Sequence, residues 1–523
     1  MLGIQLAEKG DISQETTILT EGETKIGEMA AENKVLKQFL HYSTGHVLSH
    51  TIGFITFPLL TRILIVKEYG ELSLVTNTVS LALAIVGLGL QQSVVRYYEE
   101  FRAKKDGNSL SIYYSSFLLS SVFLGACGSL GLLVITITIL RDLVGDQTVG
   151  LFCIASILVL LGCVSASLNT FLRVEQRTKL YNFVSVISRI GGYGFSFFFL
   201  FFVIKGLRGF LFGSILSSLC IIVLLLRNLL KNRTVGLKYF SFLFLKGAIA
   251  YGVPLSMLEI SHGLLNYGDR YVIQYYLHGE ALGLYTGAYT LCMHIVQAID
   301  YPILSVVPII YFELWEKKGA EAVQSFLREC LTYFSLIAFP MMFGIIGVGY
   351  ELIVSLASHK FASSAGIIPY VVIGGLIFAS STFFSAGLYI YKKTIVPGIV
   401  MMISAVINLT LNFLLVPMYG ITGAAVATLV GYASYVIIIV PISFKYLSYV
   451  PDLRSMGRYM LYSCVMLVII RQISVGGELG TLGIRLGVGV GLYSLMVFGF
   501  ESKIRKLFVK LVLGERTGYA TLS

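Results

Sequence analysis

Charged residues are scarce in this chain of 523 residues: Asp, Glu, Lys and Arg together make up 13% of it, against about 25% in an average soluble protein. Proline is also rare, with 10 residues, whereas 56% of the residues are hydrophobic and the mean hydropathy is +0.82. The apolar residues gather in blocks of about 20, the length that crosses a bilayer. This composition excludes a soluble globular protein. The blocks also leave no room for a soluble catalytic domain of about 100 to 200 residues.

The usual motifs of metal, disulfide and nucleotide chemistry are missing as well. The seven cysteines lie inside apolar blocks, without a C-x-x-C pair and without a histidine at metal-ligand spacing. They are expected to be small core residues. The seven aspartates include no D-x-D, and the chain has no P-loop. We therefore predict no metal site, no cofactor and no enzymatic activity.

Fourteen hydrophobic segments follow one another from Phe39 onward. Each is about 20 residues long, which is two or more times the length of a membrane β-strand, and none alternates polar with apolar residues. The pattern predicts an all-α membrane protein with about fourteen transmembrane helices. Their centres lie near residues 52, 83, 125, 160, 192, 216, 260, 295, 342, 376, 405, 432, 464 and 491.

The distribution of Lys and Arg orients these spans. If the N-terminus is cytoplasmic, 29 of the 39 Lys and Arg fall in inner loops and tails and nine fall in outer loops. The positive-inside rule then predicts a multi-pass protein of the cell's inner membrane with both termini in the cytoplasm. Because topology accounts for most of the net charge of +11, we expect no nucleic-acid partner. Residues 1–37 are polar, lack the basic start and apolar run of a signal peptide, and are predicted to be a cytoplasmic tail.

Four short matches recur in the same order in the two halves of the chain. Arg62 and residues 70–74 match Arg270 and residues 279–284, and residues 176–178 and 206–209 match 392–394 and 420–423, with offsets between 208 and 216. Common turn chemistry at helix ends is the alternative explanation. A repeat of six spans, an even number, has the same topology in both copies and predicts a pseudo-two-fold axis along the membrane normal.

The repeat predicts four parts of the chain: a polar cytoplasmic tail (1–37), an N-lobe with spans 1 to 6 (38–245), a C-lobe with spans 7 to 12 (246–447), and spans 13 and 14 with a basic cytoplasmic C-terminus (448–523). Spans 13 and 14 have no counterpart in the repeat. We expect them to pack on the outside of one lobe, where they would form a lipid-facing groove.

Polar side chains inside the spans are candidates for function, because a charge at the bilayer centre costs about 2.5 to 3.5 kcal/mol on insertion scales. Helical spacing places several of them on single faces of spans 1, 7 and 8, and Arg189 alone among Lys and Arg lies in the middle of a span. A packing role for each histidine and an ion pair between Arg189 and Glu259 are the structural alternatives. Asn408 and Asn412 are expected to hold helices together. The substrate-binding candidates are Arg189, Arg62, Arg270, His46, His50, His262, His294 and Gln297, and the ion-coupling candidates are Glu259, Asp269 and Asp300.

Several motifs resemble those of a known family. They are Pro58-Leu59-Leu60-Thr61-Arg62 followed by Tyr69-Gly70, Gly87-Leu88-Gly89 before Arg96-Tyr97-Tyr98, Gly252-Val253-Pro254-Leu255 with Asp269-Arg270, and the run from Ile407 to Ala425. The chain resembles, from about Leu36 to about Phe500, the polysaccharide transporter family, the flippases for lipid-linked oligosaccharides such as the O-antigen units of lipopolysaccharide. Its superfamily also contains multidrug exporters and the lipid II flippase. Many members have twelve spans, whereas fourteen are predicted here.

The resemblance implies two six-helix lobes around a cavity that opens to one side at a time. The implied substrate is a polyprenyl diphosphate-linked oligosaccharide, moved from the cytoplasmic to the outer leaflet, with Na⁺ or H⁺ as a candidate coupling ion. Membrane lipids and polysaccharide assembly proteins are the expected partners of a monomer. An anionic diphosphate would suit a cavity cation such as Arg189.

Three alternatives stay open at this point. A lipid II flippase and a multidrug cation antiporter would share the fold, and a cation exporter would favour carboxylates and aromatic rings in its cleft. A membrane glycan polymerase or ligase would need a large outer loop with paired acids or Arg and His, and no predicted outer loop is long enough.

Overall fold

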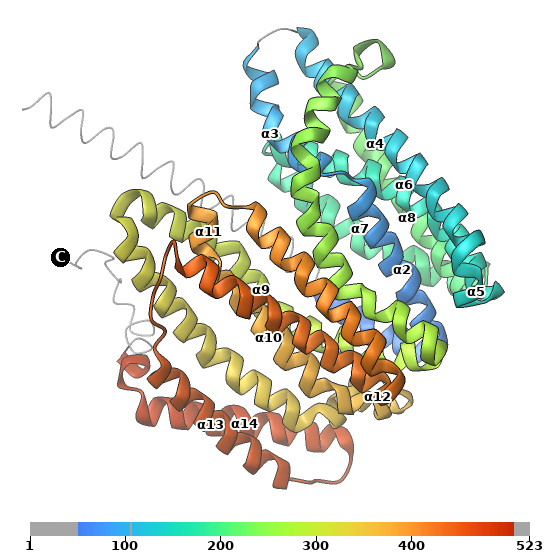
Figure 1. Ribbon diagram of the computed structural model, residues 1–523. Coiled ribbons are helices and arrows are strands. Elements are labelled where there is room, and N and C mark those ends of the chain that lie inside the picture. Colours follow the sequence, from blue (N-terminus) through green and yellow to red (C-terminus); the bar gives the residue numbers. More distant parts are fainter. Residues whose placement is uncertain (1–50, 105–106, 507–523) are drawn as a thin grey trace, which may run out of the picture.

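The computed structural model describes residues 51–104 and 107–506, and within these residues all regular structure is helical (Figure 1). His46 and His50 lie outside the described residues. After a first helix at Thr51–Ile63, the elements are α2 (Val66–Val86), α3 (Leu90–Ala103), α4 (Gly107–Ile135), η1 (Thr136–Leu140), α5 (Arg141–Val144), α6 (Asp146–Val174), α7 (Thr178–Phe198), η2 (Phe199–Val203), α8 (Leu207–Asn232), η3 (Leu237–Tyr239), α9 (Phe242–Leu356), η4 (His359–Ile367), α10 (Ile368–Phe384), α11 (Ala386–Ile390), α12 (Ile395–Phe444), α13 (Leu453–Gln472) and α14 (Glu478–Phe500).

Two of these helices contain sharp corners and cross the membrane more than once. The backbone of α9 leaves the helical region at His278 (φ 64°) and Gly319 (φ 78°), and that of α12 does so at Gly420 (φ 61°). Divided at these corners, α9 gives span 7 (242–277), span 8 (279–318) and span 9 (320–356), and α12 gives span 11 (395–419) and span 12 (421–444).

The number of crossings agrees with the prediction from the sequence. Among the described residues, ten helices are long and apolar enough to cross a bilayer. The three corners raise this number to thirteen, and the helix at Thr51–Ile63 adds the first span. Six of these crossings precede Gly252. The all-α fold class with fourteen spans is confirmed.

The helices gather in two groups, which correspond to the predicted lobes (Figure 1). Helices α2 to α8 form the N-lobe, whereas α10 to α12 pack with spans 8 and 9 in the C-lobe. The predicted boundary at residues 245/246 falls inside α9. Leu245 and Ala248 lie in a core cluster otherwise formed by N-lobe residues, so the start of span 7 packs on the N-lobe. Span 7 therefore passes from one lobe to the other.

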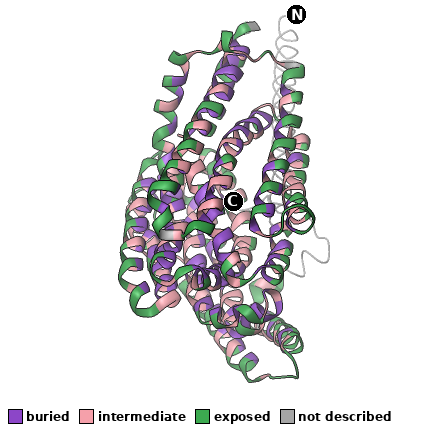
Figure 2. Ribbon diagram, turned by 90° about the vertical axis from the view of Figure 1, so that its right-hand side faces the viewer, coloured by how far each residue is buried: buried purple, intermediate pink, exposed green. Residues whose placement is uncertain are grey.

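The outer surface of the helices is apolar, as a bilayer requires. Exposed residues cover the outward helix faces (Figure 2), and they include Phe202, Ile437 and Leu479. These side chains would face lipid, because a membrane protein gains nothing by burying them from a hydrocarbon solvent.

Two of the repeat landmarks adopt the same backbone conformation in both lobes. Gln176 and Lys392 have φ angles of 57° and 59°, and the residue after each donates its N–H to the carbonyl five residues earlier. Gly206 and Gly420, with φ angles of 89° and 61°, each start the following helix. These shared left-handed corners support the duplication, because few residues adopt that conformation without a structural reason.

The first landmark has a different register from the one that the sequence match suggested. Gly70 is the fifth residue of α2, and Gly283 is the fifth residue after the corner at His278. A Cβ on Gly70 would lie 2.6 Å from the Gly283 nitrogen, so the two glycines face each other where these helices begin. Helix geometry thus pairs Gly70 with Gly283, and the match to Gly279 is four residues out of register. The axis that relates the two lobes stays a prediction.

Spans 13 and 14, which are α13 and α14, pack on the outside of the C-lobe against span 9, away from the N-lobe (Figure 1). The Tyr493 hydroxyl donates to the Leu336 carbonyl at 2.8 Å. Arg485 pairs with Glu351 at 2.8 Å, and both side chains are nearly buried. These contacts hold the extra pair of helices to the C-lobe at two heights.

Candidate functional site

The two lobes touch at the end that the charge distribution assigns to the outside. A Cβ on Gly283 would lie 1.9 Å from the Val66 carbonyl oxygen, so the two helix starts are in backbone contact. Close by, Arg62 donates to the Ser355 carbonyl at 2.9 Å, and Lys360 donates to the Arg62 carbonyl at 3.2 Å. Arg62, a predicted substrate ligand, therefore lies in the contact that closes the lobes on this side.

Span 8 forms a wall between two hollows of different chemistry. One of its faces carries His294, Gln297 and Tyr301, and with Thr51 and Phe54 of the first helix it lines a pocket of about 300 Å³. We call this the interlobe pocket. Because Asp300 and Leu304 point another way around the helix, they line a cavity of about 480 Å³ inside the C-lobe, which we call the C-lobe cavity.

Arg189 lies near the interlobe pocket, although it is not among the residues that line it. Arg189 of α7 is exposed and lies close enough to His294 and Tyr301 to act on both electrostatically. Phe54 and Phe57 pack edge-on against the His294 ring, at centroid distances of 6.2 and 6.5 Å. No described residue forms a hydrogen bond or ion pair with Arg189. A guanidinium in this setting is well placed to bind an anionic ligand.

The ion pair between Arg189 and Glu259, the structural alternative for this arginine, is not formed. Glu259 instead accepts a hydrogen bond of 2.5 Å from Gln92 on α3. This bond joins the N-lobe to span 7 of the C-lobe, and it places Glu259 where the C-lobe cavity faces the N-lobe. Arg189 is therefore not held by this carboxylate.

The C-lobe cavity is acidic and aromatic. Its lining includes two carboxylates, Glu259 and Asp300, together with His262, and none of its described lining residues is Lys or Arg. The Asp300 Oδ1 atom is buried without a hydrogen-bond partner among the described residues. The other lining residues that can stack or hydrogen-bond are Tyr311, Phe312, Phe378, Ser381, Thr382, Ser385, Tyr389 and Tyr435. Sequence reasoning missed these tyrosines, because a tyrosine in an apolar span carries no periodic signal of its own.

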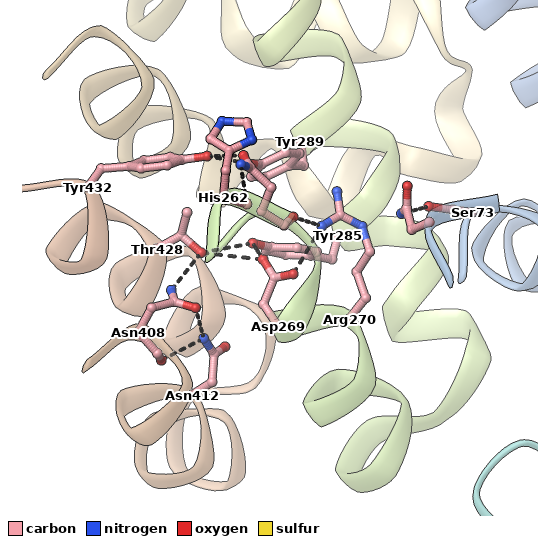
Figure 3. A network of polar contacts seen from close by, with 12 residues as sticks. Ser73, His262, Asp269, Arg270, Tyr285, Tyr289, Asn408, Asn412, Thr428 and Tyr432 are labelled. Carbon is pink, nitrogen blue, oxygen red and sulfur yellow. Dashed lines mark hydrogen bonds and ion pairs between the residues drawn. The ribbon is translucent and has the colours of Figure 1, made fainter. Parts of the chain in front are cut away.

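Asp269 and Arg270 lie outside both hollows, in a buried polar network of the C-lobe (Figure 3). The Arg270 guanidinium pairs with Asp269 Oδ1 at 3.0 Å, and it lies over the Tyr289 ring at 4.7 Å. The other carboxylate oxygen accepts from the Tyr285 hydroxyl and from Thr428, the latter at 3.3 Å. The two charges neutralise each other inside the lobe.

The same network extends to spans 11 and 12 (Figure 3). Asn408 donates to Thr428 at 3.4 Å, and Asn412 donates to the Asn408 carbonyl at 2.9 Å. On the other side, the Tyr432 hydroxyl donates to Asn266 at 2.5 Å. These bonds connect spans 7, 11 and 12, which is the helix-joining role expected for the two asparagines.

A third hollow lies between span 9 and the extra helices α13 and α14. It has a volume of about 430 Å³ and an almost wholly apolar lining that includes Gly344, Met466, Ile470 and Gly489. We call it the tail groove. Ile295 of span 8 lines both the tail groove and the interlobe pocket, so the two are neighbours.

The fold of this multi-pass helical protein is similar to that of solved transport proteins, one of them described as a member of the MOP superfamily. The structure matches that of the lipid II flippase MurJ in an inward closed conformation with a TM-score of 0.72 and 17% identity, over 89% of this chain and 99% of that one. It matches an inward-facing multidrug resistance MATE family transporter with a TM-score of 0.60 and 14% identity, over 80% of this chain and 96% of that one. At such identities the likeness concerns the fold. The chain belongs to the polysaccharide biosynthesis protein family, whose sequence model matches residues 35–315.

Two relatives of known sequence are similar to parts of the chain. An uncharacterized membrane protein of Methanocaldococcus jannaschii is 27% identical over 199 residues, which cover 37% of this chain and 38% of the relative. Protein 1 of the Lsg locus of Haemophilus influenzae is 26% identical over 318 residues, which cover 59% of this chain and 73% of the relative. The match to the archaeal protein thus spans well under half of its length.

Proposed function

We propose that this protein is a flippase that moves a polyprenyl diphosphate-linked oligosaccharide from the cytoplasmic to the outer leaflet by alternating access. One observation carries the proposal: a pocket with an unpaired arginine nearby, a cavity lined by carboxylates and aromatic rings, and an apolar groove all border span 8. Arg189 acts on Tyr301 in the interlobe pocket, Asp300 lines the C-lobe cavity, and Ile295 reaches the tail groove. A lipid-linked glycan has three parts of matching chemistry.

Each hollow would hold one part of the substrate. The planar guanidinium of Arg189 can donate two parallel hydrogen bonds to a diphosphate, and His294 and Gln297 can add further donors. The glycan would enter the C-lobe cavity, where tyrosine rings and hydroxyl groups suit sugars. The polyprenyl tail would stay in contact with hydrocarbon in the tail groove.

The closed outer contact supports entry from the opposite side. With Gly70 and Gly283 in contact, the substrate would enter from the side predicted to be cytoplasmic. Separation of this contact, together with closure at the opposite end, would expose the glycan to the outside. Na⁺ or H⁺ would couple to the cycle at Glu259 or Asp300, since both carboxylates line the cavity, whereas Asp269 is already neutralised by Arg270.

The remaining parts of the proposal concern the cell. The protein would work as a monomer in the inner membrane, with both termini in the cytoplasm and with membrane lipids and polysaccharide assembly proteins as partners. A lipid II flippase differs from this assignment only in the glycan.

A second candidate function has specific support. An exporter of organic cations would need carboxylates and aromatic rings in its cleft, and the C-lobe cavity contains both. On this assignment Arg189 would have no ligand to bind, and its loss would leave export intact.

Reconstitution in proteoliposomes separates the candidates. Two fluorescent lipids are compared, a polyprenyl diphosphate-linked oligosaccharide and lipid II, and their exchange between leaflets is followed by quenching with dithionite added outside. Transport of ethidium is followed by its release from the vesicles. We expect fast exchange of the oligosaccharide lipid, no exchange in vesicles with the Arg189→Ala protein, and slow leakage of ethidium in both. Transport of ethidium alone would refute the flippase.

A further inference from the structure

The C-lobe cavity has the wrong charge for the diphosphate end of the proposed substrate. Two carboxylates face it and no lysine or arginine does, among the described residues that line it. Arg189, which forms no hydrogen bond or ion pair with a described residue, lies near Tyr301 of the interlobe pocket. The two hollows therefore favour groups of opposite charge.

The Asp300 carboxylate indicates which kind of group suits the cavity. Its Oδ1 atom is buried and accepts no hydrogen bond from residues 51–104 or 107–506, which is costly for a polar group unless a ligand supplies the donor. Glu259, at the side of the cavity that faces the N-lobe, already accepts from Gln92 but has further lone pairs. Both positions call for a donor, and an ammonium group offers three.

The aromatic lining favours the same group. Tyr311, Tyr389 and Tyr435 surround the cavity together with Phe312 and Phe378. Ring faces attract a cation within about 6 Å. The volume of about 480 Å³ also lies within the range of about 300 to 1,000 Å³ that is typical of ligand pockets. The cavity is thus large enough for sugars and is chemically suited to positively charged ones.

The two hollows are adjacent along span 8. Asp300 lines the C-lobe cavity, and the next residue, Tyr301, lines the interlobe pocket. A ligand that passes along span 8 would meet both. In a lipid-linked glycan the groups next to the diphosphate are sugars.

We propose that the C-lobe cavity binds the glycan and selects sugars with a free, protonated amine, with Asp300 and Glu259 as the selecting carboxylates. Glycans rich in carboxylates would be rejected, because they would place like charges side by side. This inference rests on the proposed flippase function and adds the chemical class of its glycan.

Binding of soluble oligosaccharides to the purified protein in lipid nanodiscs tests the inference by calorimetry. The ligands are a tetramer of β-1,4-linked glucosamine, the same tetramer fully N-acetylated, and a tetramer of galacturonate. We expect the glucosamine tetramer to bind, the N-acetylated one to bind more weakly, and the galacturonate one not to bind. Asp300→Asn should weaken the binding of the glucosamine tetramer by about tenfold or more, since the ammonium group then meets a neutral amide in place of a charged carboxylate.

A matched variant controls for charge and another for folding. Glu321→Gln removes an exposed carboxylate far from the cavity lining and should leave binding unchanged. If Asp300→Asn does not yield folded protein, Glu259→Gln takes its place, and it should weaken the same ligand because the amide keeps the shape but not the charge.

Two results would overturn the inference. The first is binding of the glucosamine tetramer without selectivity, shown either by equal binding of all three tetramers or by binding that neither carboxylate variant changes. The second is carboxylate-dependent binding of tetraphenylphosphonium without any binding of the glucosamine tetramer, which would assign the cavity to organic cations. Arg189-dependent exchange of a lipid-linked neutral glycan would uphold the flippase function even where the glucosamine tetramer fails to bind.

Discussion

Two arginines inside the membrane-spanning part of this protein have opposite surroundings. Arg270 is buried and pairs with Asp269, and a tyrosine ring lies against it. Arg189 is exposed and pairs with no described residue. A charge at this depth needs a carboxylate, water or an anionic ligand. The first arginine has its partner within the fold, whereas the second is left for a ligand.

Replacement of Arg189 should therefore affect transport and not folding. We expect Arg189→Ala to abolish glycan translocation at normal protein abundance and Arg189→Lys to retain part of it, because lysine keeps the charge but loses the bidentate geometry. Complementation of a flippase-deficient strain, measured beside the amount of membrane protein, checks both. Arg102→Ala, an exposed arginine paired with Glu99, is the matched control. Full activity of Arg189→Ala would remove this residue from the site.

Replacement of Asp269 should affect folding. Asp269→Asn leaves the Arg270 charge buried without a counter-ion, which costs about 3 to 5 kcal/mol, so the yield of folded protein and its melting temperature should fall. The double variant Asp269→Asn with Arg270→Met should recover most of the loss. Thermal unfolding in detergent measures both. An Asp269→Asn protein that is as stable as the native one but inactive would instead favour ion coupling at this carboxylate.

At the scale of helices, the contact at the outer end depends on glycine. The start of α2 and the start of span 8 approach so closely that a Cβ on Gly283 would lie 1.9 Å from a backbone oxygen. Only a residue without a side chain allows this approach. Span 8 also contains Pro302 and Pro308, each of which removes a helical hydrogen bond and permits bending. One helix thus combines a tight contact with a flexible middle.

Alanine at Gly283 should open this contact. We expect Gly283→Ala to reduce transport and to increase the labelling, by a membrane-impermeant maleimide added outside, of a cysteine placed at Tyr69, which is buried in the closed contact. Gly131→Ala is the control, because no atom lies within 4 Å of its added Cβ. Unchanged labelling in Gly283→Ala would show that the lobes do not close through these glycines.

A large side chain in the tail groove should reduce the exchange of long-chain substrates more than that of short-chain ones. Gly489 lies on α14 and lines the groove, so Gly489→Phe would fill part of it. We expect this variant to lose the exchange of a substrate with a long polyprenyl tail and to keep more of the exchange of a short-chain analogue. The proteoliposome assay with both lipids measures the ratio. An equal loss for the two lipids would argue against a tail in this groove.

At the scale of the whole molecule, the chain forms two lobes and an appended helix pair. Span 7 starts on the N-lobe and ends in the C-lobe, and the bond between Gln92 and Glu259 crosses between the lobes. One buried cluster contains residues of both lobes, among them Leu74 and Tyr285, so movement of one lobe against the other has to rearrange this shared core. Their predicted relation is a rotation of about 180° around the membrane normal, as in transporters with parallel repeats.

Rocking of the lobes should change two distances in opposite directions. Spin labels at Lys67 and His359 report the outer ends, and labels at Arg102 and Lys317 report the opposite ends; all four side chains are exposed. In the presence of substrate we expect a population with a longer distance between the outer labels and a shorter distance between the inner labels. Pulsed electron paramagnetic resonance measures both distances. A pair within the N-lobe, Arg102 and Lys231, should not change. Parallel changes in both interlobe pairs would contradict alternating access.

Local features of the sequence were enough to predict the number of spans and much of the repeat. Hydropathy over about 20 residues determines which segments cross a bilayer, since no water is available to unpaired backbone groups. Turn chemistry is equally local. For this reason the sequence match correctly paired Gln176 with Lys392 and Gly206 with Gly420, which have positive φ angles in both lobes. By its place in the helix, Gly70 corresponds to Gly283, which lies one helical turn after the Gly279 of the sequence match.

The roles of the charged residues were decided only by tertiary structure. The sequence by itself determined that Arg189, Glu259, Asp269, Arg270 and Asp300 lie within spans, and helical spacing indicated which of them share a face. In a membrane, however, both lipid and protein cover apolar faces, so the pattern does not encode where a polar face points. The rotation and packing of spans that are distant in the chain buried the neighbouring pair Asp269 and Arg270, brought Gln92 into a hydrogen bond with Glu259, and placed Asp300 in the lining of the C-lobe cavity.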